Sequence, residues 1–257
     1  MPKIDLIFSA RDELDARQAR VVVIDVLRAT STIVTALHNG CREIIPVASL
    51  SEALALAARS GDVLLAGERN TQKPAHFDLG NSPREFTTRR VSGKRIVLTT
   101  TNGTRALRGI RNAGEVVLAS FLNIRAVSEH LKLSKRDVVF YCAGNEGRFS
   151  LEDTLCATWL IGELCAETSE WQCSDAARWS LHALENMPSA KRQETIVQWA
   201  AQSEHARKLK ENDLQADVEF CLQWDVFGEI PRLDLQGCVV PACRDVSGHR
   251  RRGSVLN

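Results

Sequence analysis

Four carboxylates lie at the ends of apolar segments or just after the turns that follow them. Asp25 lies within "VVVIDVL", Glu68 follows "DVLLAG", and Glu152 and Asp153 begin "LEDTLCATWLIGEL". A hard cation such as Mg²⁺ takes oxygen ligands, commonly one or two carboxylates together with water and substrate phosphate. We therefore predict that these acids bind a metal ion or transfer protons. Each acid alone also suits an ordinary role, either in the first turn of a helix or as an ion-pair partner, as Arg28 could be for Asp25.

A turn rich in threonine follows one of the apolar segments, in "IVLTTTNGTRAL" (96–107). Glycine lets the main chain approach a ligand closely, and a strand that turns into a helix leaves unpaired N–H groups facing one point. This pattern predicts that a phosphoryl group binds at Thr100, Thr101, Asn102, Gly103 and Thr104. Taken alone, the segment equally fits an ordinary cap at the start of a helix.

Two further polar turns, "DVLRATST" (25–32) and "FDLGNSP" (77–83), and the short segment "GERN" (67–70) carry groups that could bind an anion. In open α/β sheets ligands gather at the carboxyl ends of the strands, so such turns can converge on one crevice. We predict that an acidic substrate binds to Arg28, Thr30, Ser31, Arg69 and Asn81. The alternative for Glu68 and Arg69 is a solvated surface loop.

Cys142 offers a rival mechanism, because "CAGNEGR" (142–148) has the C-x5-R spacing of cysteine-dependent phosphatases. In that mechanism a thiolate attacks phosphorus while the arginine, here Arg148, holds the oxygens. Negative charge nearby, from Glu146 among others, would raise the pKa of the thiol and so disfavour the thiolate. A small residue buried at the end of a strand is the simpler interpretation of Cys142.

The elements that must position these residues alternate between strand and helix. Short, β-branched and nearly continuous apolar segments predict strands at 21–27, 43–48, 62–68, 95–100, 115–121 and 137–143, with helices at 30–38, 50–60, 103–112, 123–132 and 151–167. This alternation predicts an α/β fold in three layers (α/β/α) with a mostly parallel or mixed sheet.

The predicted organisation is a single domain over residues 1–245. Segments 21–54 and 95–127 share one order of strand, threonine-rich turn, helix and strand, which suggests similar halves at about 20–90 and 95–170. The segment 171–230 reads as helices packed on the sheet, with a final helix over 209–221. Residues 246–257 form a basic tail that we predict to be flexible.

Composition excludes several classes of protein. With 33 basic and 32 acidic residues the formal net charge is +1, so the chain has no general field for nucleic acid or an anionic membrane. No apolar run approaches the roughly 18 residues of a membrane span, and the charged N-terminal segment does not resemble a signal peptide, so we expect a cytoplasmic protein. The eight cysteines show no metal-binding spacing and are predicted to be free thiols. The sequence leaves open whether copies associate into a homo-oligomer.

The motifs taken together resemble the 2-phosphosulfolactate phosphatase family. The matching segments are "VIDVLRATSTI" (23–33), "AGER" (66–69), "FDLGNSP" (77–83), "TTTNGT" (99–104), "CAGNEGRFSLEDTLCA" (142–157) and, more loosely, "DVEFCLQWDVFGEIP" (217–231). The resemblance implies a Mg²⁺-dependent phosphatase with a three-layer α/β fold. Its substrate would be 2-phospho-3-sulfolactate, hydrolysed to 3-sulfolactate and phosphate in the biosynthesis of coenzyme M.

Three mechanisms remain open at this point. The simplest is direct attack on phosphorus by a metal-activated water. A covalent intermediate on Asp25 or on Cys142 is the alternative route. A non-catalytic protein that binds a phosphorylated or sulfonated acid is the alternative function, although paired carboxylates beside an anion site speak against it.

Overall fold

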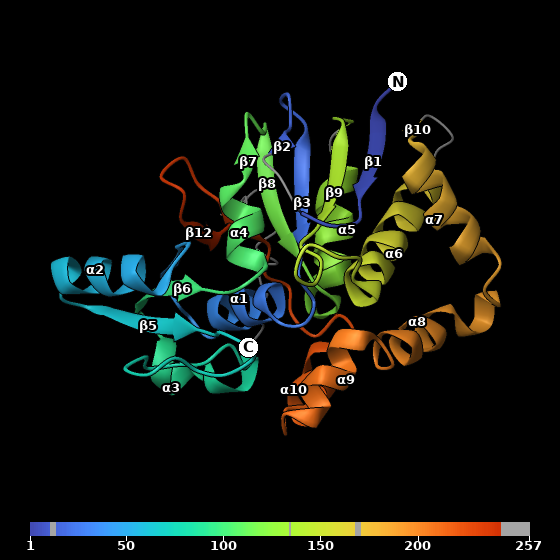
Figure 1. Ribbon diagram of the computed structural model, residues 1–257. Coiled ribbons are helices and arrows are strands. Elements are labelled where there is room, and N and C mark those ends of the chain that lie inside the picture. Colours follow the sequence, from blue (N-terminus) through green and yellow to red (C-terminus); the bar gives the residue numbers. More distant parts are fainter. Residues whose placement is uncertain (11–13, 134, 168–170, 243–257) are drawn as a thin grey trace, which may run out of the picture.

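The computed structural model describes residues 1–10, 14–133, 135–167 and 171–242 (Figure 1). The predicted tail at 246–257 lies outside the described residues. A ten-stranded sheet runs through the molecule. In chain order its strands are β1 (Lys3–Ile7), β3 (Arg20–Ile24), β4 (Glu43–Pro46), β5 (Val63–Gly67), β6 (Arg95–Thr99), β8 (Glu115–Ala119), β9 (Val138–Cys142), β10 (Gln172–Cys173), β11 (Pro231–Leu233) and β12 (Val239–Pro241). Two short strands, β2 (Leu14–Asp15) and β7 (Ile110–Arg111), form a separate parallel pair.

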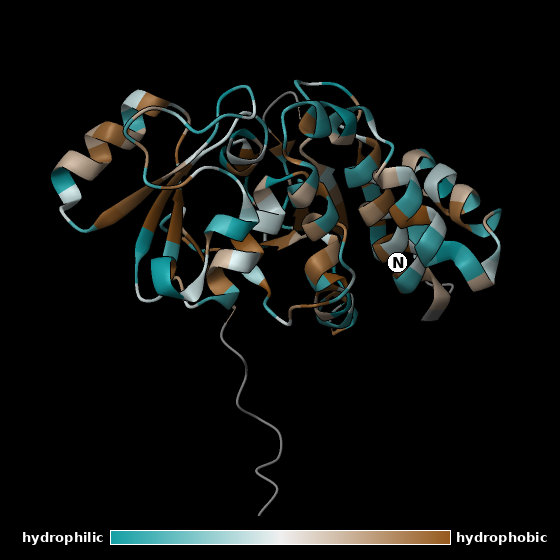
Figure 2. Cartoon of the chain, turned by 90° about the horizontal axis from the view of Figure 1, so that it is seen from below, coloured by the Kyte–Doolittle hydropathy of each residue, from teal (hydrophilic) through white to brown (hydrophobic). Residues whose placement is uncertain are grey.

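The α-helices cover the sheet and extend beyond it. They are α1 (Ala29–His38), α2 (Leu50–Ser60), α3 (Thr88–Val91), α4 (Gly103–Arg108), α5 (Ile124–Lys132), α6 (Leu151–Glu167), α7 (Asp175–Glu185), α8 (Arg192–Ala200), α9 (Glu204–Glu211) and α10 (Gln215–Cys221). Figure 2 shows apolar residues concentrated on the strands, between helices whose outer faces are more polar. Among the described residues, no helix combines the length and the apolar character needed to cross a bilayer.

The central strand β3 shows why the sheet needs helices on both faces. All five of its residues are buried, and it pairs in parallel with both β8 and β9. Successive side chains of a strand point to opposite faces. Accordingly Val22 and Ile24 join one hydrophobic core, which includes α6, and Val21 and Val23 join another, which includes α1 and α4. The predicted three-layer α/β fold is confirmed.

An antiparallel hairpin divides the sheet into two parallel groups. The order is β10-β1-β9-β3-β8, then the hairpin β11-β12, then β4-β6-β5. Both outer contacts of the hairpin, with β8 and with β4, are antiparallel. In Figure 1 the strands β5 and β6 point toward the centre of the molecule, where the turns that follow β3 and β9 also lie. The sheet is therefore mixed, and both groups contribute turns to one region.

The register within each group aligns the ends of neighbouring strands. Gly67 at the end of β5 pairs with Thr99 at the end of β6, so Glu68 leaves the sheet beside the threonine turn. Ile24 at the end of β3 pairs with Cys142 at the end of β9. Asp25 therefore leaves the sheet beside the segment that leads to α6.

The C-terminal part differs from the expected single helix over 209–221. The structure has two helices there, α9 and α10, separated at Asn212 and Asp213. Asp213 has a φ of 59°, which is left-handed backbone that ends a helix. The hairpin β11-β12 and the strand β1 were not among the predicted strands. The described cysteines, from Cys41 to Cys238, are free thiols as predicted.

Candidate active site

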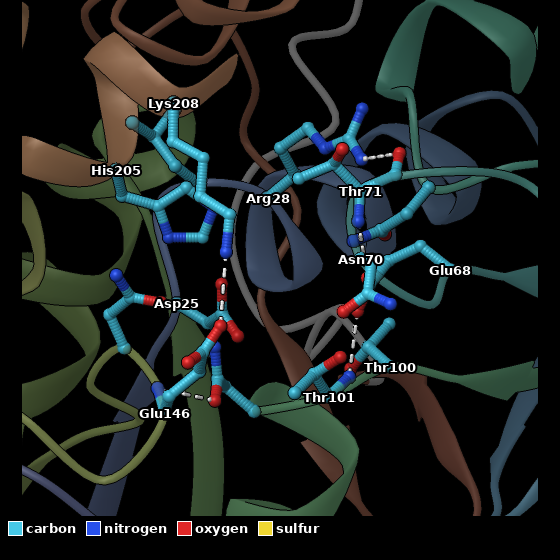
Figure 3. A pocket seen from close by; sticks show the side chains of 14 residues that line it. Asp25, Arg28, Glu68, Asn70, Thr71, Thr100, Thr101, Glu146, His205 and Lys208 are labelled. Atoms are coloured by element: carbon cyan, nitrogen blue, oxygen red, sulfur yellow. Dashed lines mark hydrogen bonds and ion pairs between the residues drawn. The ribbon is translucent and has the colours of Figure 1, made fainter. Parts of the chain in front are cut away.

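A pocket lies where turns from both strand groups meet α9 (Figure 3). Its lining comes from the ends of β3, β5, β6 and β9 and from two residues of α9, so segments far apart in the sequence build it. The lining residues are Asp25, Leu27, Arg28, Glu68, Asn70, Thr71, Asn81, Thr100, Thr101, Asn102, Asn145, Glu146, His205 and Lys208. Seven of the residues predicted from the sequence are thus brought together: Asp25, Arg28, Glu68, Asn81, Thr100, Thr101 and Asn102.

Asp25 is a buried acid held at the start of α1. Its Oδ1 accepts a hydrogen bond from the Ala29 N–H at 3.1 Å, and its own N–H donates to Thr30 Oγ1 at 3.1 Å. Burial raises the pKa of Asp25 to about 7, and the nearby negative charges of Glu68 and Glu152 add to this effect. Asp25 is therefore a group that a cation in the pocket would stabilise in its ionised form.

Gly103 allows α4 to approach Asp25 closely. A Cβ atom at this position would lie 2.7 Å from Asp25 Oδ2 and 2.5 Å from Ala29 Cβ. Both distances are shorter than van der Waals contact, so a larger residue would push the threonine turn away from Asp25. Gly103 is needed here because of this close approach.

We predict that Gly103→Ala lowers phosphatase activity and destabilises the protein by about 1–3 kcal/mol, the usual cost of overpacking a core. Gly228→Ala is the matched control, because no atom lies within 4 Å of a Cβ built there. Urea unfolding and phosphate release would measure both effects. Equal behaviour of the two variants would contradict the steric role of Gly103.

Glu68 joins the turns after β5 and β6. Its Oε1 accepts a hydrogen bond from the Thr101 N–H at 2.7 Å, and its Oε2 accepts from the Thr71 N–H at 3.1 Å. Close by, two buried polar atoms, Thr71 Oγ1 and Asn81 Oδ1, have no hydrogen-bond partner within the described parts of the chain. Buried polar atoms of this kind normally have a partner, so an unpaired amide oxygen beside two carboxylates suits a cation or its bound water.

The threonine turn is braced from within. The Thr100 N–H donates to Thr104 Oγ1, and the Thr104 N–H donates to Thr100 Oγ1, both at 3.1 Å. Thr104 therefore supports the turn and does not line the pocket. Thr100, Thr101 and Asn102 do line it, as expected for a group that binds phosphoryl oxygens.

Arg28 lines the pocket. Its charge is balanced by Asp217, which the sequence analysis did not assign to the site. Its Nη1 lies 2.6 Å from Asp217 Oδ2 of α10, and both side chains are almost completely buried. Arg28 Nη2 also donates to the Thr71 carbonyl at 3.0 Å, and Ser82 Oγ donates to Asp217 Oδ1 at 2.6 Å. Asp217 thus orients the guanidinium. Asp217 begins the loosely matching segment 217–231, but its place on an amphipathic helix did not mark it as the partner of Arg28.

Besides Gly103 and Thr104 of the threonine turn, three residues predicted to bind the acidic substrate do not line this pocket. Thr30 Oγ1 donates to the Asp25 carbonyl, and Ser31 Oγ donates to the Val26 carbonyl, so both hydroxyls hold the turn between β3 and α1. Arg69 lies on the other side of the threonine turn, where it lines a neighbouring cavity. The polar residue types were recognised, but the direction of each side chain depends on local backbone geometry.

Glu152 and Asp153 lie behind the pocket and do not line it. Asp153 accepts hydrogen bonds from the Val26 N–H at 2.8 Å and the Gly144 N–H at 3.2 Å, which ties β3 to the turn after β9. Burial raises the pKa of Asp153 well above its ordinary value, and Glu152 and Asp25 add to the effect. Glu152 is also buried and lies 4.0 Å from His205. These two acids therefore influence the pocket electrostatically, through their negative charge near Asp25.

Cys142 is fully buried in the core and does not line the pocket. Burial raises the pKa of its thiol well above the ordinary value, and the charge of Asp153 raises it further. Arg148 is exposed, and its backbone closes a tight turn with Asn145. The geometry therefore does not support a thiolate nucleophile at Cys142.

Two further pocket residues, His205 and Lys208, were missed because their positions depend on how α9 docks. His205 and Lys208 lie one turn apart on α9, a spacing that is ordinary for an amphipathic helix. Burial lowers the pKa of His205 to about 4, with the charges of Arg28 and Lys208 contributing, so its imidazole is neutral at pH 7. Lys208 Nζ lies 3.0 Å from Glu146 Oε1, which places a cation and its partner at the pocket rim.

The described residues contain no group of three or more histidine, cysteine, aspartate or glutamate side chains arranged to hold a metal ion. The four acids predicted to bind a metal ion therefore do not surround a single position. Asp25 and Glu68 nevertheless both face the pocket, beside the unpaired Asn81 oxygen. Two carboxylates completed by water and substrate phosphate are a usual arrangement for Mg²⁺. The residues therefore fit such an ion, whose identity stays a prediction.

Comparison with known proteins places this pocket in a family. A family model described as 2-phosphosulpholactate phosphatase matches residues 8–236. The chain is similar to a probable 2-phosphosulfolactate phosphatase of Thermotoga petrophila, with 45% identity over 230 residues that cover 90% of this chain and 95% of that protein. It is also similar to a protein of the same description from Caldanaerobacter subterraneus, with 40% identity over 88% of this chain and 92% of that protein.

These matches extend over the segments that build the pocket, from Asp25 to Lys208. They confirm the resemblance that the sequence motifs indicated. The chain belongs to the 2-phosphosulpholactate phosphatase family.

Proposed function

We propose that this protein hydrolyses 2-phosphosulfolactate to sulfolactate and phosphate, and that Mg²⁺ assists the reaction. The observation that carries the proposal is the meeting of Asp25, Glu68 and the Thr100–Asn102 turn in one pocket. Family membership supports the reaction type and the substrate named for the relatives. The cytoplasmic location stays a prediction from the sequence.

The residues of the pocket have separate tasks in this reaction. The N–H and hydroxyl groups of Thr100, Thr101 and Asn102 hold the phosphoryl oxygens, because a turn of this kind presents several donors to one anion. Arg28 and Lys208 add positive charge on the opposite side, as their places in Figure 3 indicate. Asp25 and Glu68 are the residues that would hold Mg²⁺. When bound, the ion neutralises phosphoryl oxygens and lowers the pKa of a bound water.

The group that transfers a proton should have a pKa near the pH of the reaction. Asp25 satisfies this condition, because burial raises its pKa to about 7, whereas His205 is held neutral by a pKa of about 4. In this mechanism Asp25 would accept a proton from the attacking water. Attack by Asp25 on phosphorus is the covalent alternative. Trapping radioactive phosphate on acid-quenched enzyme would reveal it.

Removing the metal tests the proposal directly. We expect phosphate release from 2-phosphosulfolactate in the presence of Mg²⁺, loss of release to background in EDTA, and recovery when Mg²⁺ is added back. Release measured with phosphate-detection reagents should give this pattern at pH 7–8. Undiminished release in EDTA would contradict the role of the metal. No release under any condition, together with thermal stabilisation by the substrate, would instead indicate a binding protein.

A further inference from the structure

The pocket described above is small compared with the substrate proposed for it. Its volume is about 30 Å³, room for about two water molecules. Pockets that bury a small organic ligand usually measure about 300–1,000 Å³. The pocket is therefore too small to enclose a molecule that carries a phosphate, a carboxylate and a sulfonate.

A second cavity, which we call the arginine cavity, adjoins the first across the threonine turn. Its volume is about 410 Å³, and its lining consists of Ala48, Arg69, Thr100, Thr101, Arg105, Arg108 and Gly109. Thr100 and Thr101 line both cavities. A ligand whose phosphoryl group lies at these threonines is therefore next to the arginine cavity.

The two cavities differ in charge. Three acids line the small pocket, and its cations Arg28 and Lys208 are each paired with a carboxylate, Asp217 and Glu146. The arginine cavity is lined by three arginines, and no carboxylate of the described residues lines it. The arginine cavity is therefore the more favourable of the two for an anionic group that lies away from the phosphoryl group.

The guanidinium of Arg69 is held in place by neutral oxygens. Nη1 donates to the Glu68 carbonyl at 2.6 Å, and Nη2 donates to Thr99 Oγ1 at 2.8 Å. Such contacts fix its orientation and leave its charge uncancelled by these partners. Arg108, in contrast, forms an ion pair with Glu52 at the exposed edge. Glu68 and Arg69 are successive residues at the end of β5. Glu68 lines the small pocket, and Arg69 lines the adjacent arginine cavity.

We propose, on the basis of the proposed function, that the arginine cavity binds the sulfonate of the substrate while Thr100 and Thr101 hold its phosphoryl group. In 2-phosphosulfolactate the phosphate and the carboxylate are both attached through C2, whereas the sulfonate is on C3. The carboxylate thus stays near the threonines, and the sulfonate is the group that extends away from the reacting phosphorus. A sulfonate is ionised at every pH at which the protein is folded, and its three oxygens accept hydrogen bonds from guanidinium groups.

Arg105 is the residue best suited to test this assignment. It is exposed on α4, so we expect its replacement to disturb the fold less than replacement of Arg69, which braces the ends of β5 and β6. We would compare Arg105→Gln and Arg105→Lys with wild type, using 2-phosphosulfolactate and 2-phospholactate, which lacks the sulfonate. Arg89→Gln, an exposed arginine of α3 outside both cavities, is the control with the same change of charge.

The measured quantity is the ratio of kcat/KM for 2-phosphosulfolactate to kcat/KM for 2-phospholactate. We expect Arg105→Gln to lower this ratio about tenfold or more, the usual effect of losing a charge-assisted hydrogen bond, chiefly through KM. Arg105→Lys should recover part of it, and Arg89→Gln should keep the wild-type ratio. An unchanged ratio in Arg105→Gln would overturn the assignment.

Failure of the proposed function can be distinguished from failure of this inference. If wild type hydrolyses neither substrate, the proposed reaction is wrong, and titration calorimetry with 3-sulfolactate then tests the arginine cavity alone. Binding to wild type at least tenfold tighter than to Arg105→Gln would support the sulfonate site. Equal affinities, or no binding to wild type, would overturn it.

Discussion

Asp25→Asn should lower kcat by about 10²- to 10⁴-fold, the range expected when a group that transfers a proton is removed. The same change should raise the thermal stability of the metal-free protein at pH 8. Asparagine keeps the acceptor for the Ala29 N–H but carries no charge. Activity and stability therefore change in opposite directions. This pattern is expected because the ionised Asp25 carboxylate is needed for the reaction but is costly to bury.

The dependence on pH has a definite sign. Burial raises the pKa of Asp25 from 3.8 in the unfolded chain to about 7 in the folded protein, so the folded state resists ionisation. Asp25 therefore costs no stability below about pH 4, and its cost grows between about pH 4 and pH 7 and is complete above that. Melting temperatures measured in EDTA from pH 4 to pH 8 should converge for wild type and Asp25→Asn at the acid end and separate at the alkaline end.

Asp62→Asn is the control for this experiment, because its side chain is 85% exposed and far from the pocket lining. It should leave kcat and the shape of the pH profile unchanged. A melting temperature of Asp25→Asn at or below that of wild type at pH 8 would show that the ionised carboxylate does not destabilise the fold. Retention of wild-type kcat would remove Asp25 from the mechanism.

Asp217→Asn should destabilise the protein by about 3–5 kcal/mol, because it leaves the buried Arg28 guanidinium without a countercharge. It also weakens the contact with Ser82, so the turns at 71 and 82 lose a shared support. We further expect KM to rise, since Arg28 is no longer held in one orientation at the pocket. Urea unfolding and steady-state kinetics would measure the two effects.

Two further variants separate charge from packing. Glu219→Gln lies on the same helix, is exposed and makes the same change of charge, so it should be nearly neutral. The double variant Arg28→Met with Asp217→Leu removes the pair together and should recover much of the stability while activity stays low. Equal stabilities of Asp217→Asn and Glu219→Gln would contradict the importance of the buried pair.

The strand ends were predictable because strands leave strong local patterns. Continuous β-branched segments identified β3, β5, β6 and β9, and the residue after each strand could be named from the sequence. Asp25, Glu68 and Thr100–Asn102 were found in this way. Parallel pairing then aligned these ends, so residues from different segments came together without further information.

Side-chain direction was not predictable, because it changes from one residue to the next. Glu68 and Arg69 were both assigned to the site from one segment, yet Glu68 lines the small pocket and Arg69 lines the arginine cavity. Thr30 and Ser31 likewise turn back to the main chain. Successive side chains of a strand point to opposite faces of the sheet. Two neighbouring residues at a strand end can therefore face different cavities.

The sequence by itself determined the fold class, the family and the acids and threonines at the strand ends, since these depend on local patterns and on contiguous motifs. Only the tertiary structure placed His205 and Lys208 at the pocket and Asp217 against Arg28, because their positions depend on the break at Asp213 and on the docking of α9 and α10. It also separated Asp153 and Cys142 from the pocket by burying them behind it. Contacts between residues more than a hundred positions apart arise from packing of the whole chain, and no local pattern encodes them.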